Sequence, residues 1–123
     1  MPKLFIISGL LLITALGYSQ ASRKIGGEIL NEEEKPIPGL GVTQLGKTPE
    51  TLTDVDGRFE LMVDNGPITY IRVSGLDLVI YLQYSEKDEF RKVTLKDWKK
   101  IKKESKRVSK KWHRKMKALE KNS

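Results

Sequence analysis

The sequence predicts an all-β fold, a sandwich of about seven strands, followed by a basic amphipathic helix at the C-terminus. From Arg23 to Leu95, apolar residues recur with a period of two, and turn residues interrupt them about every eight to twelve positions, which is typical of a sandwich or barrel. From Lys96 to Lys121 there are 13 Lys/Arg against 3 acids, which is +10, whereas residues 1–95 hold 10 against 13, which is −3. The basic segment contains no Gly or Pro, so one continuous helix is permitted there.

The length and composition set further limits. A chain of 123 residues has room for one domain, and a hydrophobic content of 38% is ordinary for a globular protein. The sequence has no cysteine, which excludes disulfides, thiol nucleophiles, thiolate metal sites and a lipid-modified cysteine. The predicted sandwich must therefore be held together by packing.

The first nineteen residues have the pattern of a secretory signal peptide. Lys3 supplies the positive start, the apolar stretch 4–16 follows, and Gly17 and Ser19 occupy the −3 and −1 positions of a cleavage before Gln20. The apolar stretch is shorter than the roughly 20 residues that span a bilayer. We expect residues 1–19 to be removed and the mature protein to be exported, to the periplasm or the outer membrane. A buried N-terminal element or an uncleaved anchor is the alternative.

The strands are expected in order along the middle of the chain. Turns are expected at 31–35, 54–57 and 65–67, where charged residues, Asn, Gly and Pro gather. The segment 76–84 is nearly continuous in apolar residues, so we expect a central strand that is covered on both faces. The expected strands are 25–29, 37–45, 51–53, 58–63, 68–74, 76–84 and 90–95.

Three groups of residues resemble a known family. They are Ile25-x-Gly27, Pro36-Ile37-Pro38-Gly39-x-x-Val42 and Thr53-Asp54-x-Asp56-Gly57-x-Phe59-x-Leu61. Over about residues 24–84 the chain is similar to the carboxypeptidase regulatory-like domain, although Gly75-Leu76 stands where that family usually has Gly-Tyr or Gly-Phe. The resemblance implies a Greek-key sandwich related to transthyretin (prealbumin) over residues 20–95, of the kind that follows a signal peptide in Bacteroidetes. It implies no substrate, because fold does not fix function.

No catalytic arrangement is indicated. Asp54 and Asp56 precede Gly57 too closely for a calcium loop, so a backbone turn is the better interpretation. The acids 32–34 are consecutive on a turn, where solvation leaves little to raise a pKa, and His113, the sole histidine, lies in the basic segment. We expect no enzyme activity, no cofactor and no metal, and the sequence identifies no small-molecule substrate.

The basic segment 96–123 predicts a helix with two faces. Thr94 is the expected N-cap, with Asp97 three positions later as in a capping box. At about 100° per residue the apolar residues, together with Ser105, fall on one arc, which we call the apolar seam. The seam consists of Trp98, Ile101, Val108, Trp112, Met116 and Leu119. The basic face on the other side is represented by Lys99, Lys103, Lys106, Arg107, Lys110, Arg114 and Lys117.

Three interpretations of this helix remain open. Its seam could pack on the sandwich, enter an anionic surface of lipid or lipopolysaccharide with the lysines on phosphates, or dock on a partner helix or barrel. Nucleic acid is not expected as a partner because the protein is predicted to be exported. The function expected is a non-catalytic binding or scaffolding module of the cell envelope, whose partner is an envelope protein or an anionic membrane surface. The alternative is an adhesion protein that binds anionic lipid or lipopolysaccharide through the tail.

Overall fold

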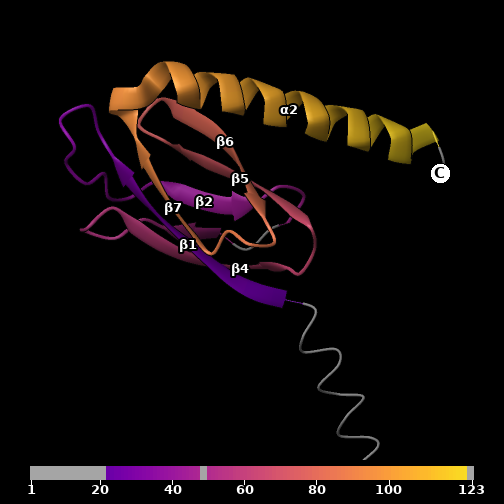
Figure 1. Ribbon diagram of the computed structural model, residues 1–123, viewed down its shortest axis with the longest axis horizontal. Coiled ribbons are helices and arrows are strands. Elements are labelled where there is room, and N and C mark those ends of the chain that lie inside the picture. Colours follow the sequence, from indigo (N-terminus) through magenta and orange to yellow (C-terminus); the bar gives the residue numbers. More distant parts are fainter. Residues whose placement is uncertain (1–21, 48–49, 122–123) are drawn as a thin grey trace, which may run out of the picture.

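The computed structural model describes residues 22–47 and 50–121 (Figure 1). The predicted signal peptide, residues 1–19, lies outside them. The described chain forms seven strands, one 3₁₀ turn and one helix. In order these are β1 (Ser22–Leu30), β2 (Gly41–Gln44), β3 (Glu50–Leu52), β4 (Arg58–Asp64), β5 (Ile68–Gly75), β6 (Leu78–Ser85), β7 (Phe90–Thr94), η1 (Leu95–Asp97) and α2 (Trp98–Lys121).

The strands form two sheets. One has the order β4-β1-β7, in which β1 is antiparallel to β4 and parallel to β7. The other has the order β3-β2-β5-β6, and its neighbours are all antiparallel. Both sheets contribute to one cluster of buried apolar side chains, which gives a sandwich-like architecture. The prediction of a mostly β protein with a C-terminal helix is therefore confirmed.

Alternating side chains of β4 show how the sequence pattern builds this core. Phe59, Leu61 and Val63 are buried, whereas the residues between them are exposed, as period two requires. The Phe59 ring occupies the space beside Gly27, where a Cβ would lie 2.5 Å from a ring carbon. Across the core, the Tyr84 hydroxyl of β6 donates a 2.7 Å hydrogen bond to the Gly26 carbonyl of β1. Burial raises the pKa of Tyr84 far above its usual value, so the hydroxyl stays protonated as a donor.

The predicted strand 37–45 is too long. The strand β2 covers only Gly41–Gln44. The preceding residues 37–40 divide their backbone hydrogen bonds between Ile29 and Thr53, and they also bond to the Thr53 side chain, so they extend no single ladder. The Thr53 hydroxyl donates to the Ile37 carbonyl at 2.7 Å and accepts from the Leu40 amide at 2.9 Å. Thr53 is buried, so these bonds are shielded from water. The segment 37–40 is therefore a fixed connection between β1 and β2.

The prediction that 76–84 is a central strand is wrong. The strand β6 begins at Leu78 and lies at the edge of its sheet, with β5 as its one strand neighbour. Leu76 and Asp77 instead form the two-residue turn of the β5–β6 hairpin, with φ of 51° and 63°. The apolar run was misleading because Ile80, Leu82 and Tyr84 face the core while α2 covers part of the other side.

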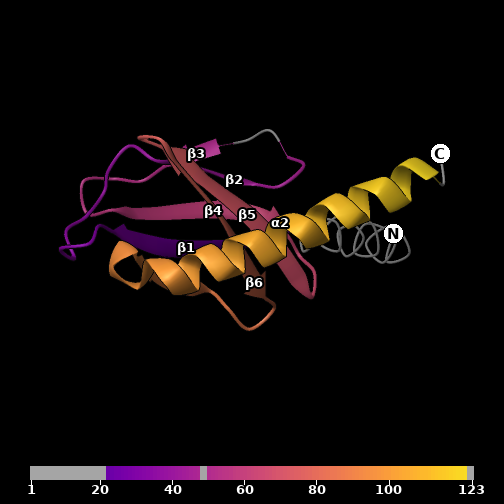
Figure 2. The same cartoon turned by 90° about the horizontal axis from the view of Figure 1, so that it is seen from above.

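The helix α2 follows the β6 edge and then extends beyond the sheets (Figures 1 and 2). Thr94, the predicted N-cap, is the extended N-cap residue of the 3₁₀ turn that precedes the helix, and the Thr94 hydroxyl accepts from the Lys96 amide at 3.4 Å. One 3₁₀ turn, η1, separates this cap from the α-helix, so Leu95 belongs to the turn rather than to β7. Within 22–47 and 50–121, no helix is both long and apolar enough to cross a bilayer.

Candidate functional site

The apolar seam of α2 is divided between the sandwich and solvent. Ile101 and Val108 are buried, and Ile101 belongs to the main core cluster. Trp112 is half-buried, with the tip of its indole against Gly46 in the β2–β3 connection, where a Cβ would lie 2.8 Å from the ring. At the two ends of the helix, Trp98 is 41% exposed and Leu119 is 55% exposed. Met116 is half-buried. The middle of the seam therefore packs against the sandwich of the same chain.

Side chains of α2 also complete the hydrogen bonding of β6. The Tyr81 amide donates to the Ser105 hydroxyl, and the Gln83 amide donates to the Glu104 carboxylate, both at 3.0 Å. An edge strand otherwise presents unpaired backbone donors, which favour pairing with another chain. Because Ser105 and Glu104 accept these two donors, this stretch of the β6 edge is closed by the helix.

An ion pair connects the helix to the β4-β1-β7 sheet. Arg91 of β7 donates to both carboxylate oxygens of Glu104, with 2.9 Å between Nη2 and Oε1, and it also reaches the Gln83 carbonyl at 3.2 Å. Burial alone would raise the pKa of Glu104, but the hydrogen bonds from Arg91 and from the Gln83 amide outweigh it and hold that pKa below its usual value. One carboxylate therefore joins β6, β7 and α2.

The sequence alone did not identify this junction. The sequence pattern predicts no site at Arg91, and Glu104 is one of only three acids in the basic segment. The available signal was the place of Glu104, three residues after Ile101 and four before Val108, where a helix puts it beside the buried seam. Its partner lies 13 residues away in another element, so the local pattern could not indicate Arg91.

The predicted basic face lies on the exposed side of the helix. All seven of its residues are exposed, and the Arg107 guanidinium donates to the Gln83 side chain at 3.3 Å. The buried residues of α2 turn the opposite side toward the sandwich. His113 is exposed in the outer half of the helix, with Nδ1 2.7 Å from the Ser109 carbonyl. The structure thus gathers the basic residues into one solvent-facing surface.

The family-like turn motif has a structural role. The Asp54 carboxylate accepts from the Asp56 and Arg58 amides, both at 2.9 Å, and so closes the β3–β4 turn. Gly57 has a φ of 71°, and a Cβ there would lie 2.5 Å from the Ile29 carbonyl. Within the described ranges, no three His, Cys, Asp or Glu side chains are grouped as metal ligands would be.

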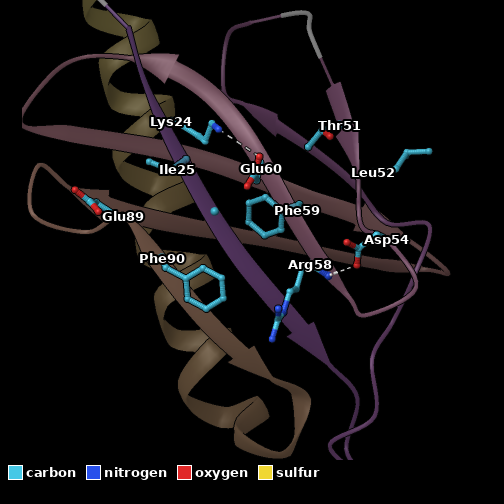
Figure 3. A pocket seen from close by; sticks show the side chains of 11 residues that line it. Lys24, Ile25, Thr51, Leu52, Asp54, Arg58, Phe59, Glu60, Glu89 and Phe90 are labelled. Atoms are coloured by element: carbon cyan, nitrogen blue, oxygen red, sulfur yellow. Dashed lines mark hydrogen bonds and ion pairs between the residues drawn. The ribbon is translucent and has the colours of Figure 1, made fainter.

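A shallow cavity of about 750 Å³ lies over the outer face of the β4-β1-β7 sheet (Figure 3). Gly26 and Phe90 both line it; Phe90 is 54% exposed, and a Cβ at Gly26 would lie 3.1 Å from the Phe59 carbonyl oxygen. Leu52, which is 60% exposed, lines it from β3, and the Lys24 ammonium lies 3.5 Å from the Glu60 carboxylate. The cavity therefore combines exposed apolar groups with charges of both signs.

Comparison of the sequence with protein-family models gave no match, and comparison with curated proteins gave none.

Proposed function

We propose that the protein is an exported, non-catalytic binding or scaffolding module of the cell envelope. In this proposal it has a transthyretin-like, Greek-key sandwich of the carboxypeptidase regulatory-like kind. The signal-like residues 1–19 support export, and the motif 53–59, which forms a tight turn against β1, supports the family relationship. The predicted lack of enzyme activity is part of the same proposal.

The observation that carries the proposal is the anchoring of α2. Core packing by Ile101 and the Glu104–Arg91 ion pair hold the helix on the sandwich, while its basic face points to solvent. A helix so held is a fixed recognition surface rather than a loose tail. The cavity beside Phe90 gives the sandwich a second, chemically different surface.

The alternative function is adhesion to an anionic envelope surface through the basic face. The exposure of the basic residues favours it, because exposed cations attract phosphate-bearing surfaces and do so less at high salt. In this alternative the sandwich serves to present the helix, and the cavity has no essential part.

Crosslinking in intact envelopes, followed by mass spectrometry, tests the proposal. The baits are the mature chain, a cavity variant with Leu52→Ser and Phe90→Ser, and a helix variant with Lys106→Gln, Lys110→Gln and Lys117→Gln. The substituted residues are exposed, so both variants should fold. Removal of the whole segment after Leu95 is less informative, because it would uncover the β6 edge and part of the core.

A partner that is lost from the cavity variant and kept by the helix variant supports the binding module. Loss of envelope association from the helix variant alone supports adhesion. A mature chain that stays in the cytoplasm, or that crosslinks to no envelope component, contradicts the proposal.

A further inference from the structure

The outward side of α2 carries an unbroken line of cations, which we call the cationic stripe. Its members follow one another every three or four residues, so they fall within an arc of about 80° over a length of about 33 Å. They are Lys99, Lys103, Lys106, Lys110, Arg114, Lys117 and Lys121, and all are exposed. The two acids of α2, Glu104 and Glu120, lie outside this arc.

The packing of α2 fixes the direction of the stripe. Ile101 and Val108 are buried against the sandwich, and Glu104 and Ser105 bond to β6 from the same side. The stripe lies nearly opposite these residues around the helix, so it faces solvent while the helix stays docked. The indoles of Trp98 and Trp112 belong to the seam and point away from the stripe. Any surface that meets the stripe therefore meets cations without the indoles.

The charge and the shape of the stripe favour one kind of binding partner. A second copy would place stripe against stripe, and like charges would repel. The two indoles of the helix are on the wrong side to stack on the bases of a single strand that meets the stripe. A straight row of cations on a convex rod fits a flat layer of phosphates, which a bilayer with anionic headgroups provides.

We propose that the cationic stripe binds an anionic lipid bilayer while α2 stays docked on the sandwich. The contact is electrostatic and lies at the headgroups, and the seam does not enter the bilayer. This inference deepens the adhesion alternative, and it differs from the interpretation in which the apolar seam enters the anionic surface. Insertion would require Ile101 and Val108 to leave the core.

Vesicle binding tests the stripe. The chain from Gln20 to Ser123, which keeps every described residue, is titrated with phosphatidylcholine vesicles that contain either no or one-third phosphatidylglycerol. The stripe variant carries Lys106→Gln, Lys110→Gln and Lys117→Gln. The matched control carries Lys35→Gln, Lys87→Gln and Lys92→Gln, which are exposed lysines of the sandwich. Circular dichroism confirms that both variants fold.

We expect binding to the anionic vesicles alone. This binding should weaken steeply between about 50 and about 300 mM salt, because salt screens the exposed charges. Each cation near an anionic surface strengthens binding about fivefold. The stripe variant lacks three of them, so it should bind the anionic vesicles roughly a hundredfold more weakly. The control should lose less than about fivefold. Equal losses in the two variants, or no binding to anionic vesicles, would overturn the proposal.

Tryptophan fluorescence tests the docked geometry. Both tryptophans of the chain lie in α2, so the whole signal reports on this helix. We expect no blue shift on binding and no quenching by lipids brominated on the acyl chain. A blue shift with quenching would show insertion and overturn the docked mode. Tighter, stripe-dependent binding to a DNA duplex at the same salt would reassign the surface to nucleic acid. A cavity-dependent partner found by crosslinking would uphold the binding module even if vesicle binding failed.

Discussion

The two halves of α2 have similar composition and different surroundings. Residues 98–108 contain both buried residues of the helix, Ile101 and Val108, and the acceptors Glu104 and Ser105. Residues 109–121 reach the sandwich through Trp112 on Gly46 and then extend past the sheets (Figure 1). A regular apolar seam runs through both halves, so periodicity alone does not decide which part of a helix is buried. Polar acceptors beside the seam mark the anchored half.

The largest expected effect is on the seam itself. Val108→Asp places a charge at a fully buried site, so we expect a loss of about 3 kcal/mol or more in the free energy of unfolding. Leu119→Asp puts the same charge on the exposed part of the seam, and its effect should stay within about 0.5 kcal/mol. Urea denaturation followed by circular dichroism measures both. Equal losses would show that the outer half is packed as firmly as the inner one.

The second effect concerns the ion pair. Glu104→Ala leaves the Gln83 amide and the Arg91 guanidinium without their acceptor, and we expect a loss of about 2 kcal/mol. Glu120→Ala removes the other acid of α2 and should cost less than about 0.5 kcal/mol, since this residue is exposed. If the pair works as one unit, Arg91→Met combined with Glu104→Ala should cost less than the sum of the single changes. An additive result would contradict the coupling.

Sequence reasoning succeeded where one residue pattern decided one structure. Alternation in β4 correctly placed Phe59, Leu61 and Val63 inside, because strand geometry sends alternate side chains to opposite faces. The Thr94 cap and the seam were also found, because helix starts and helix faces are local properties. The turn at Asp54 followed from its short polar side chain, which bonds to nearby amides.

The failures involve neighbours that are distant in the chain. The apolar run in β6 indicated cover on both faces, but it could not show that the cover on one side is a helix and that the strand is an edge. Thr53 bonds to residues 13 and 16 positions before it, Leu40 and Ile37, in the segment where the pattern predicts the start of β2. Glu104 gained its role from β6 and β7 together. Tertiary partners decided each of these cases, and spacing within one element cannot reveal them.

A third prediction concerns the border between the two halves. Gly46 has a φ of 84°, and a Cβ there would lie 2.8 Å from the Trp112 ring. We therefore expect Gly46→Ala to lower the free energy of unfolding by about 1 kcal/mol and to shift the tryptophan emission. Gly66→Ala is the matched control, because a Cβ there meets nothing within 4 Å, and its effect should be within about 0.5 kcal/mol. An unshifted emission in Gly46→Ala would mean that the indole does not rest on this loop.

The smallest effect is a dependence of stability on pH that arises in the anchored half. The pKa of Glu104 is lower in the folded protein than its ordinary value of about 4.3, so the unfolded chain binds a proton more readily. The stabilisation is therefore present above that ordinary value and is lost as the pH falls through the folded pKa. Its size should be about 1 kcal/mol or less, because the side chain is partly exposed.

Comparison with Glu104→Gln isolates this contribution. Ser85 likewise lowers the pKa of Asp88, by donating hydrogen bonds from its amide and its hydroxyl, but that effect is the same in both proteins and cancels in their difference. We expect the parent chain to lose more stability between pH 7 and pH 3 than the variant, as measured by urea denaturation at each pH. Parallel profiles would show that the charge of Glu104 adds nothing. In that case the inner half of α2 would be held by Ile101, Val108 and the hydrogen bonds that Ser105 and Glu104 accept from β6, and the ion pair with Arg91 would serve only to orient the helix.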